Sequence, residues 1–93
     1  MNVRKINPED VNRYHFTQDD ALQLEEDRSQ RIHKLINAVV LSNTEHQDIG
    51  IVIKLDNGEV IETFSDLIDF ADDFVVIKGG AAIPLKAIVD VEF

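Results

Sequence analysis

The strongest constraint on the fold is a regular alternation of residues on either side of an Asn-Gly pair. Ile49, Ile51, Ile53 and Leu55 recur at every second position, which is the period of a strand with one buried face. Asn57-Gly58 follows, and this pair favours a two-residue turn in which both central residues take positive φ. We therefore predict an antiparallel hairpin that begins near Ile49 and ends near Phe64.

Residues 65–93 continue with short strands. Residues 65–73 break the alternation and predict a bulge or bend before a third strand at residues 74–78. Gly79-Gly80 then predicts a turn, and residues 81–85 a fourth strand in which Pro84, which lacks a donor, suits an edge or a strand end. A single turn at residues 86–88 precedes a fifth strand that runs to Phe93. A hydrophobic last strand suggests that it pairs near the first strand and closes the sheet.

A long helix is predicted before the strands, at residues 17–43. Thr17 stands three residues before Asp20, as in a capping box. Apolar residues then recur at steps of three and four: Ala21, Leu24, Ile32, Leu35, Ile36, Val39 and Val40. The interval between Leu24 and Ile32 has no apolar residue, so we expect the second half of the helix to pack on the core and the first half to project or to meet a partner.

The length of 93 residues supports one domain with one core. We divide it into an N-terminal arm at residues 1–16, in which Asn7-Pro8 could start a short helix, the helix at 17–43, and the strands at 48–93. The predicted fold class is α+β: an N-terminal helix followed by a five-stranded, strongly bent antiparallel barrel of the SH3-like or Sm-like kind.

The charge is acidic and unevenly distributed. The net charge is −9, and residues 35–93 alone hold eleven acidic side chains against three basic ones. Such a surface repels phosphate backbones, so nucleic acid is not expected to bind the barrel. The chain has no cysteine, no signal-peptide pattern and no apolar run long enough for a membrane span, and we expect a cytoplasmic protein that does not contact membranes.

Two families are similar in pattern to residues 49–93, which have the layout of Sm-like barrels. A helix, the Asp-Asn-Gly turn, Leu67-Ile68-Asp69 and the terminal IPLKAIVDVE resemble the bacterial YolD-like family, for which a link to error-prone DNA repair polymerases has been proposed; the family's N-terminal Asp-Arg-Gly and tryptophan-containing segment is absent. NGEVIETFSDL resembles the hairpin of the Rho-binding antiterminator (Rof-like), which implies an acidic barrel that binds a basic protein. The basic RNA-binding stretch of Hfq-type Sm proteins has no counterpart in PLKAIVD.

The densest group of candidate site residues is acidic: Asp66, Asp69, Asp72 and Asp73. Their register does not match an EF-hand, so we predict no metal site and consider either a solvated acidic turn or a patch for a basic partner. His15, His33 and His46 lack the paired spacing of metal ligands. Ser42 and Ser65 lack the glycine elbow of a nucleophile. We predict no cofactor and no enzymatic activity.

The function predicted from the sequence is that of a non-enzymatic interaction or regulatory module that acts through protein–protein contacts. The alternative is a nucleic-acid-associated protein that uses Arg4, Lys5 and Arg13 near Tyr14, because the phenylalanines at 64, 70, 74 and 93 alternate with acids and are interpreted as core. We also predict a homodimer in which Ala21, Leu22 and Leu24 are buried against a second copy. The alternative is that residues 1–16 fold back and cover these leucines with Val11, Tyr14 and Phe16.

Overall fold

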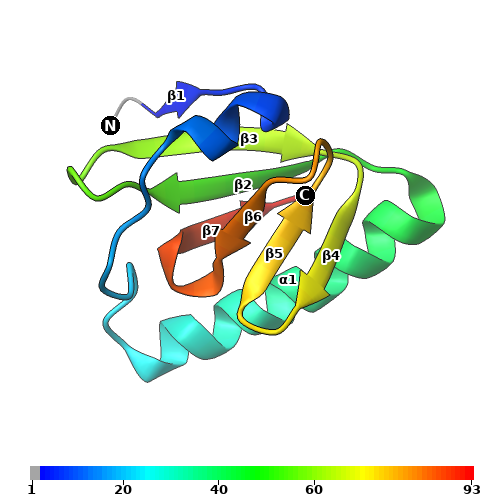
Figure 1. The fold of residues 1–93 in the computed structure, drawn as a ribbon. Helices are drawn as coiled ribbons and strands as arrows, with labels where there is room; N and C mark the ends of the chain where they lie inside the picture. Colours follow the sequence, from blue (N-terminus) through cyan, green and yellow to red (C-terminus); the bar gives the residue numbers. More distant parts are fainter. Residues whose placement is uncertain (1–2) are drawn as a thin grey trace.

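The computed structural model describes residues 3–93 as an α+β fold with one α-helix and two open sheets (Figure 1). The N-terminal part holds β1 (Arg4–Lys5) and the 3-10 helix η1 (Pro8–Arg13), and the single α-helix is α1 (Glu25–Glu45). The remaining elements are β2 (Ile49–Lys54), β3 (Val60–Ser65), β4 (Ile68–Ala71), β5 (Phe74–Ile77), β6 (Ala82–Pro84), the 3-10 helix η2 (Leu85–Ala87) and β7 (Ile88–Glu92).

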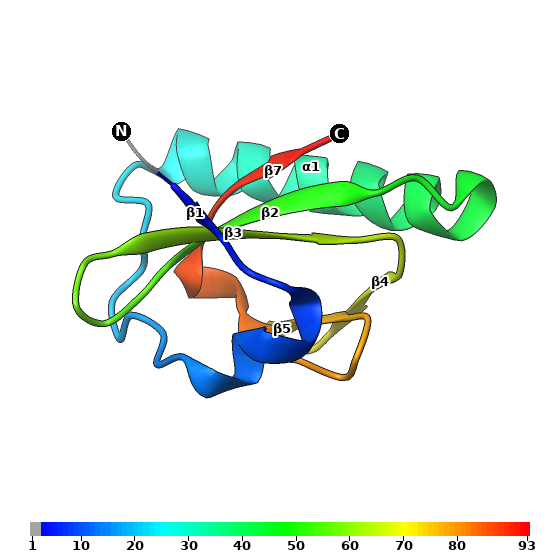
Figure 2. The same ribbon diagram turned by 90° about the horizontal axis from the view of Figure 1, so that it is seen from above.

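The first sheet has the order β1-β3-β2-β7 and is mixed, because β1 runs parallel to β3 while the other pairs are antiparallel. The second sheet is antiparallel, with the order β4-β5-β6. Helix α1 lies along β7 of the first sheet and β4 of the second. Seen from above, η1 and α1 lie on opposite sides of the molecule (Figure 2).

The hairpin predicted around Gly58 is confirmed. Strands β2 and β3 pair from Ile49 with Ser65 to Lys54 with Val60, and Gly58 has φ of 86°. The turn type differs from the prediction, since Gly58 takes positive φ but Asn57 does not. The Leu55 amide donates to the Glu59 carbonyl, and the Gly58 amide donates to the Leu55 carbonyl. This is the pattern of a three-residue loop with a glycine in the left-handed region, in place of a two-residue turn.

The prediction of a closed five-stranded barrel is wrong: within residues 3–93 the strands form two open sheets and no closed barrel. One reason is that β1 occupies the outer edge of β3, so that edge does not pair with another strand of the C-terminal half. Another is the bend in the backbone after Ser65, where β3 ends. The Ser65 hydroxyl donates to the Leu67 carbonyl and accepts from the Leu67 and Lys78 amides. The last strand does pair with β2, as expected, but η2 separates it from β6.

The helix begins at Glu25, eight residues later than predicted, and ends at Glu45. The Thr17 capping box does not form, because Asp20 accepts hydrogen bonds from Arg31 and from the Leu22 amide. Residues 17–24 instead form a connection held to the strands: the Thr17 amide donates to Lys54 and the Ala21 amide to Lys86. Glu25, Glu26 and Asp27 fill the first turn of α1, where negative charge is favourable.

Isoleucines dominate the core, with Ile49, Ile51, Ile53, Ile61 and Ile83 fully buried. The N-terminal arm contributes Val11, and Tyr14 and Phe16 pack against the same cluster. The interpretation of the four phenylalanines as core residues is wrong for three of them, whereas Phe70 packs against the core cluster. Phe64, Phe74 and Phe93 are exposed and Phe70 is partly buried, because the β-branched side chains of the inner strand faces already fill the space between the sheets.

Within residues 3–93, no helix combines the length and the apolar composition needed to cross a membrane.

Candidate functional site

The most distinctive surface feature is an apolar groove between α1 and β4, which we call the α1–β4 groove. It is a hollow of about 350 Å³ lined by Ile32, Ile36, Val39, Val40 and Phe70. Ile32, Ile36 and Val40 are 41, 52 and 55% exposed, although each is a large aliphatic side chain. Clustered exposed apolar side chains on a folded domain are typical of an interaction surface.

The exposure of these residues follows from how α1 is rotated. The helix turns Arg31, Leu35, Ala38 and Ser42 toward the core, so the buried face contains two small residues and one charged residue. Ala38 and Ser42 allow α1 to approach the strands closely. Ile32, Ile36 and Val40 follow one another at four-residue steps. They therefore form a second stripe along α1, which faces away from the core.

The other wall of the groove is β4, which lies alongside α1 and is an edge strand of the second sheet. Ile68 points into the core, Phe70 is partly buried in the groove, and Asp69 between them is exposed. The turn that follows β4 contains Asp72 and Asp73, both exposed. The side chains that line the groove are therefore all apolar, and the acids of the β4–β5 hairpin are not among them.

The four aspartates predicted as a partner-binding patch are spread along the β4–β5 hairpin. Asp66 precedes β4 and approaches the Lys78 ammonium at 3.8 Å, while Asp72 and Asp73 occupy the turn at the other end. Asp72 takes the left-handed conformation, with φ of 54°. Within residues 3–93, no three carboxylate, histidine or cysteine side chains gather closely enough to hold a metal ion.

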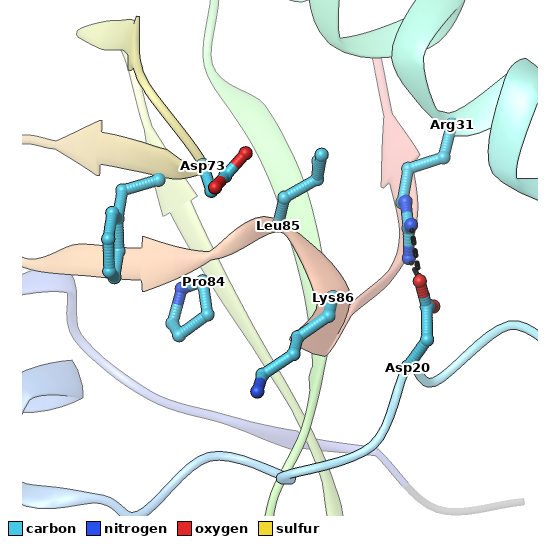
Figure 3. Close-up of a pocket in the computed structure, with 7 residues that line it drawn as sticks. Asp20, Arg31, Asp73, Pro84, Leu85 and Lys86 are labelled. Carbon is cyan, nitrogen blue, oxygen red and sulfur yellow. Dashed lines mark hydrogen bonds and ion pairs between the residues drawn. The ribbon is translucent and has the colours of Figure 1, made fainter.

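A second hollow, also about 350 Å³, lies where the connection 17–24 meets β6 and η2 (Figure 3). We call it the charged cavity, and its lining is Asp20, Arg31, Asp73, Phe74, Pro84, Leu85 and Lys86. Figure 3 shows the Arg31 guanidinium and the Asp20 carboxylate joined at one side of it, with Pro84 and Leu85 between them and Asp73. The cavity is mixed in charge, in contrast to the groove.

Arg31 is the central residue of the charged cavity, and its side chain is only 4% exposed. It donates two hydrogen bonds to Asp20, at 2.9 and 3.0 Å, and one to the Ile88 carbonyl at 3.0 Å. The hydrogen bonds from Arg31 lower the pKa of the Asp20 carboxyl below its ordinary value, against an opposing effect of burial. Arg31 Nε is buried without a partner. These contacts connect the 17–24 segment, α1 and β7, so we interpret the pair as a structural clamp.

A third feature lies on β2 and β3, where Gly50 stands beside Phe64 and Glu92 in the strand register. Glu62 is buried, and a Cβ at Gly50 would lie only 3.1 Å from its Oε2 atom. Burial raises the pKa of the Glu62 carboxyl, and a hydrogen bond with Glu92 raises it further. The glycine thus leaves room for a hydrogen-bonded carboxyl pair on the outer face of the sheet.

The residues predicted to mediate self-association lie before α1 and not within it. Ala21 and Leu22 are partly buried within the 17–24 connection, whereas Leu24 is 64% exposed. The prediction that these residues lie in the projecting first half of a helix is therefore wrong, because α1 starts only at Glu25. Self-association through these residues stays a prediction.

The basic residues of the N-terminal arm are placed beside acids and aromatic rings. Arg4 pairs with Glu59 at 3.0 Å and lies over the Tyr14 ring, and Lys5 lies over the Phe64 ring. Arg13 approaches Asp10 at 3.8 Å. The two serines considered as nucleophiles both donate to backbone carbonyls: Ser42 to Val39 and Ser65 to Leu67.

Comparisons of the chain with protein-family models, with curated proteins and with solved structures found no match.

Sequence reasoning missed the α1–β4 groove. The sequence pattern predicts that Ile32, Ile36 and Val40 face the core together with Leu35 and Val39, but these three side chains are exposed. The signal that separates the two stripes is present in the sequence, since Ala38 and Ser42 extend the Leu35 row at steps of three and four and mark the side of closest packing. The role of Phe70 could not be recognised in the same way, because it depends on how β4 is placed against α1.

Proposed function

We propose that the protein is a non-enzymatic interaction module that binds another protein through the α1–β4 groove. One observation carries the proposal: three large aliphatic side chains of α1 are about half exposed and face a hollow shared with Phe70. Burying such a surface is the usual driving force of protein association.

The other candidate binding surfaces offer weaker support for a ligand than the α1–β4 groove does. In the charged cavity, the buried Arg31 is already paired with Asp20 and donates to Ile88. The basic residues of the N-terminal arm lie against Glu59, Asp10 and aromatic rings, so no specific observation favours nucleic acid as the ligand. The resemblances to the YolD-like family and the Rho-binding antiterminator stay predictions.

The test is photo-crosslinking in the source cell, with a photoreactive amino acid at position 36 of the full chain. The matched control places the same group at position 67, because Leu67 is similarly exposed but lies outside the groove. We expect a discrete crosslinked protein from position 36 that is absent from position 67. Once identified by mass spectrometry and purified, it should form a complex with the chain that Ile32→Asp prevents.

Equal crosslinking from positions 36 and 67 would contradict the proposal. So would a purified crosslinked protein whose binding is unaffected by Ile32→Asp, because the contact would then lie elsewhere.

A further inference from the structure

We propose that Asn57 is a site of spontaneous chemical modification. Its side-chain amide is lost as ammonia through a cyclic imide formed with the Gly58 backbone nitrogen, and aspartate or isoaspartate is left at position 57. This modification does not depend on the α1–β4 groove or on the function proposed for it. The geometry of the turn between β2 and β3 carries the inference.

The turn leaves both reacting residues open to water. Asn57 and Gly58 are exposed and lie outside regular secondary structure. Gly58 has no side chain, and a Cβ built on it would meet no heavy atom within 4 Å. A side chain at this position would hinder the approach of the backbone nitrogen to the Asn57 Cγ atom, and glycine removes that obstacle. Ring closure therefore needs no rearrangement of neighbouring residues.

The Asn57 side chain is held with its carbonyl group polarised. The Glu59 amide donates to the Asn57 Oδ1 atom at 2.9 Å. This hydrogen bond makes Cγ more electrophilic and stabilises the negative charge that develops on Oδ1 when a nucleophile attacks. One contact opposes the reaction, because the Gly58 amide donates to the Leu55 carbonyl at 3.0 Å. A hydrogen bond in an exposed turn opens at low free-energy cost, so it slows the reaction without preventing it.

The reaction needs water and no other reactant. A hydroxide ion removes the proton of the Gly58 amide, and the nitrogen attacks Cγ of Asn57. The bond from Cγ to Nδ2 then breaks, and Nδ2 takes up a proton and leaves as ammonia. Water opens the resulting five-membered imide at one of its two carbonyl carbons. Cleavage at Cγ gives aspartate, and cleavage at the backbone carbonyl carbon gives isoaspartate.

The fold distinguishes Asn57 from the other asparagines of residues 3–93, which are Asn7, Asn12, Asn37 and Asn43. Asn37 and Asn43 lie inside α1, where the following backbone nitrogen belongs to the helix and the following residue carries a side chain. Asn12 lies in η1 and precedes an arginine. Asn7 precedes proline, whose nitrogen has no proton to lose. Asn57 thus combines an exposed turn with a following glycine.

The two products should differ in their effect on the hairpin. Aspartate keeps the backbone path and adds one negative charge to a chain of net charge −9, between the acidic residues Asp56 and Glu59. Isoaspartate routes the backbone through the side-chain carbon and so lengthens a loop that is closed by the hydrogen bonds between Leu55 and Glu59 and between Gly58 and Leu55. We therefore expect the isoaspartate form to unfold at a lower temperature than the aspartate form.

The experiment incubates the full chain at neutral pH and physiological temperature, folded in buffer and unfolded in urea. Peptide mapping by mass spectrometry follows the conversion of amide to acid at each asparagine, and an isoaspartyl methyltransferase labels isoaspartate. In the folded chain we expect Asn57 to react at least about tenfold faster than Asn37 and Asn43. Both aspartate and isoaspartate should form at position 57.

Matched variants test the chemistry at this site. Asn57→Gln should abolish the modification at position 57, because glutamine would have to close a six-membered ring. Asn43→Gln is the control with the same chemical change, and it should leave the rate at Asn57 unchanged. Gly58→Ala should slow the reaction in buffer and also in urea, where its effect on the turn plays no part.

Three results would overturn the inference. An Asn57 that reacts in urea but stays intact in the folded chain would show that the turn protects it. Aspartate without isoaspartate at position 57 would indicate direct hydrolysis of the side chain in place of the cyclic imide. Equal rates at Asn57, Asn37 and Asn43 in the folded chain would show that the turn does not select the site.

Discussion

Two hydrogen bonds, of 2.9 and 3.0 Å, join the Arg31 guanidinium to the two carboxylate oxygens of Asp20. Arg31 belongs to the first half of α1, and Asp20 belongs to the connection that precedes the helix. Because Arg31 also donates to Ile88 of β7, the pair fixes the start of α1 against the first sheet. We therefore expect this anchoring to help hold α1 in the rotation that exposes Ile32 and Ile36.

Removal of Asp20 should therefore destabilise the fold strongly. Asp20→Ala leaves the buried Arg31 charge without its partner, which costs about 3 kcal/mol in typical proteins. The control is Glu59→Ala, which breaks the exposed pair with Arg4 and should cost less than about 1 kcal/mol. Urea unfolding of both variants measures the difference, and equal free energies of unfolding would show that the Arg31–Asp20 pair does not anchor the helix.

The same pair predicts an acid-sensitive part of the stability. The pKa of Asp20 is lowered in the folded chain, mainly by the hydrogen bonds from Arg31. A lowered pKa means that the unfolded chain binds the proton more readily, so this stabilisation is present above the ordinary aspartate pKa and is lost as the pH falls through the folded value. Unfolding free energies below pH 5 should fall less steeply in Asp20→Asn than in the native chain. Identical slopes would contradict the assignment.

The ionisation of Glu62 should change the stability with pH in the opposite direction to that of Asp20. Burial and the hydrogen bond with Glu92 raise its pKa, so the folded chain binds the proton more readily than the unfolded chain. This contribution is fully present below the ordinary glutamate pKa and is lost as the pH rises through the folded value. Glu62→Gln should stabilise the chain at pH 7 by roughly 1 kcal/mol, the scale of a relieved buried polar group. Thermal unfolding at pH 4 and pH 7 tests this, and a variant less stable than the native chain at pH 7 would refute it.

Substitution of Gly58 should lower the stability of the chain because of its backbone conformation alone. Its φ is 86°, and a Cβ would meet no heavy atom within 4 Å. Gly58→Ala should thus cost about 1 kcal/mol, from the left-handed conformation alone. A D-alanine introduced by chemical synthesis should restore most of that loss. Equal stabilities of the L- and D-alanine chains would point to a cause other than φ.

The parts of the fold that sequence predicts are those specified by nearby residues. The alternation of Ile49, Ile51 and Ile53 with the following Asn57-Gly58 specifies the β2–β3 hairpin within a short segment. Barrel closure depends instead on pairing between distant segments. The residues of β1, Arg4 and Lys5, show no strand periodicity, yet they take the edge of β3 that the barrel would require.

The start of α1 and the exposed stripe of the α1–β4 groove could not be predicted from nearby residues. Thr17 and Asp20 have the spacing of a capping box, but a buried arginine eleven residues further on binds the same aspartate. No local pattern in the sequence shows whether Asp20 takes part in a capping box or binds Arg31. The apolar residues of α1 likewise form two adjacent stripes, and the choice between them is made by how closely Ala38 and Ser42 pack against the strands.

The affinity of the partner crosslinked through position 36 tests most directly whether the α1–β4 groove is the interaction surface. Calorimetry should compare the native chain with Ile36→Asp and Leu67→Asp, two changes at aliphatic residues of similar exposure. We expect Ile36→Asp to weaken binding by about thirtyfold or more, as for a residue at the centre of an interface, and Leu67→Asp to leave it within about twofold. Equal affinities of the two variants, or a larger loss in Leu67→Asp, would show that the groove is not the interaction surface.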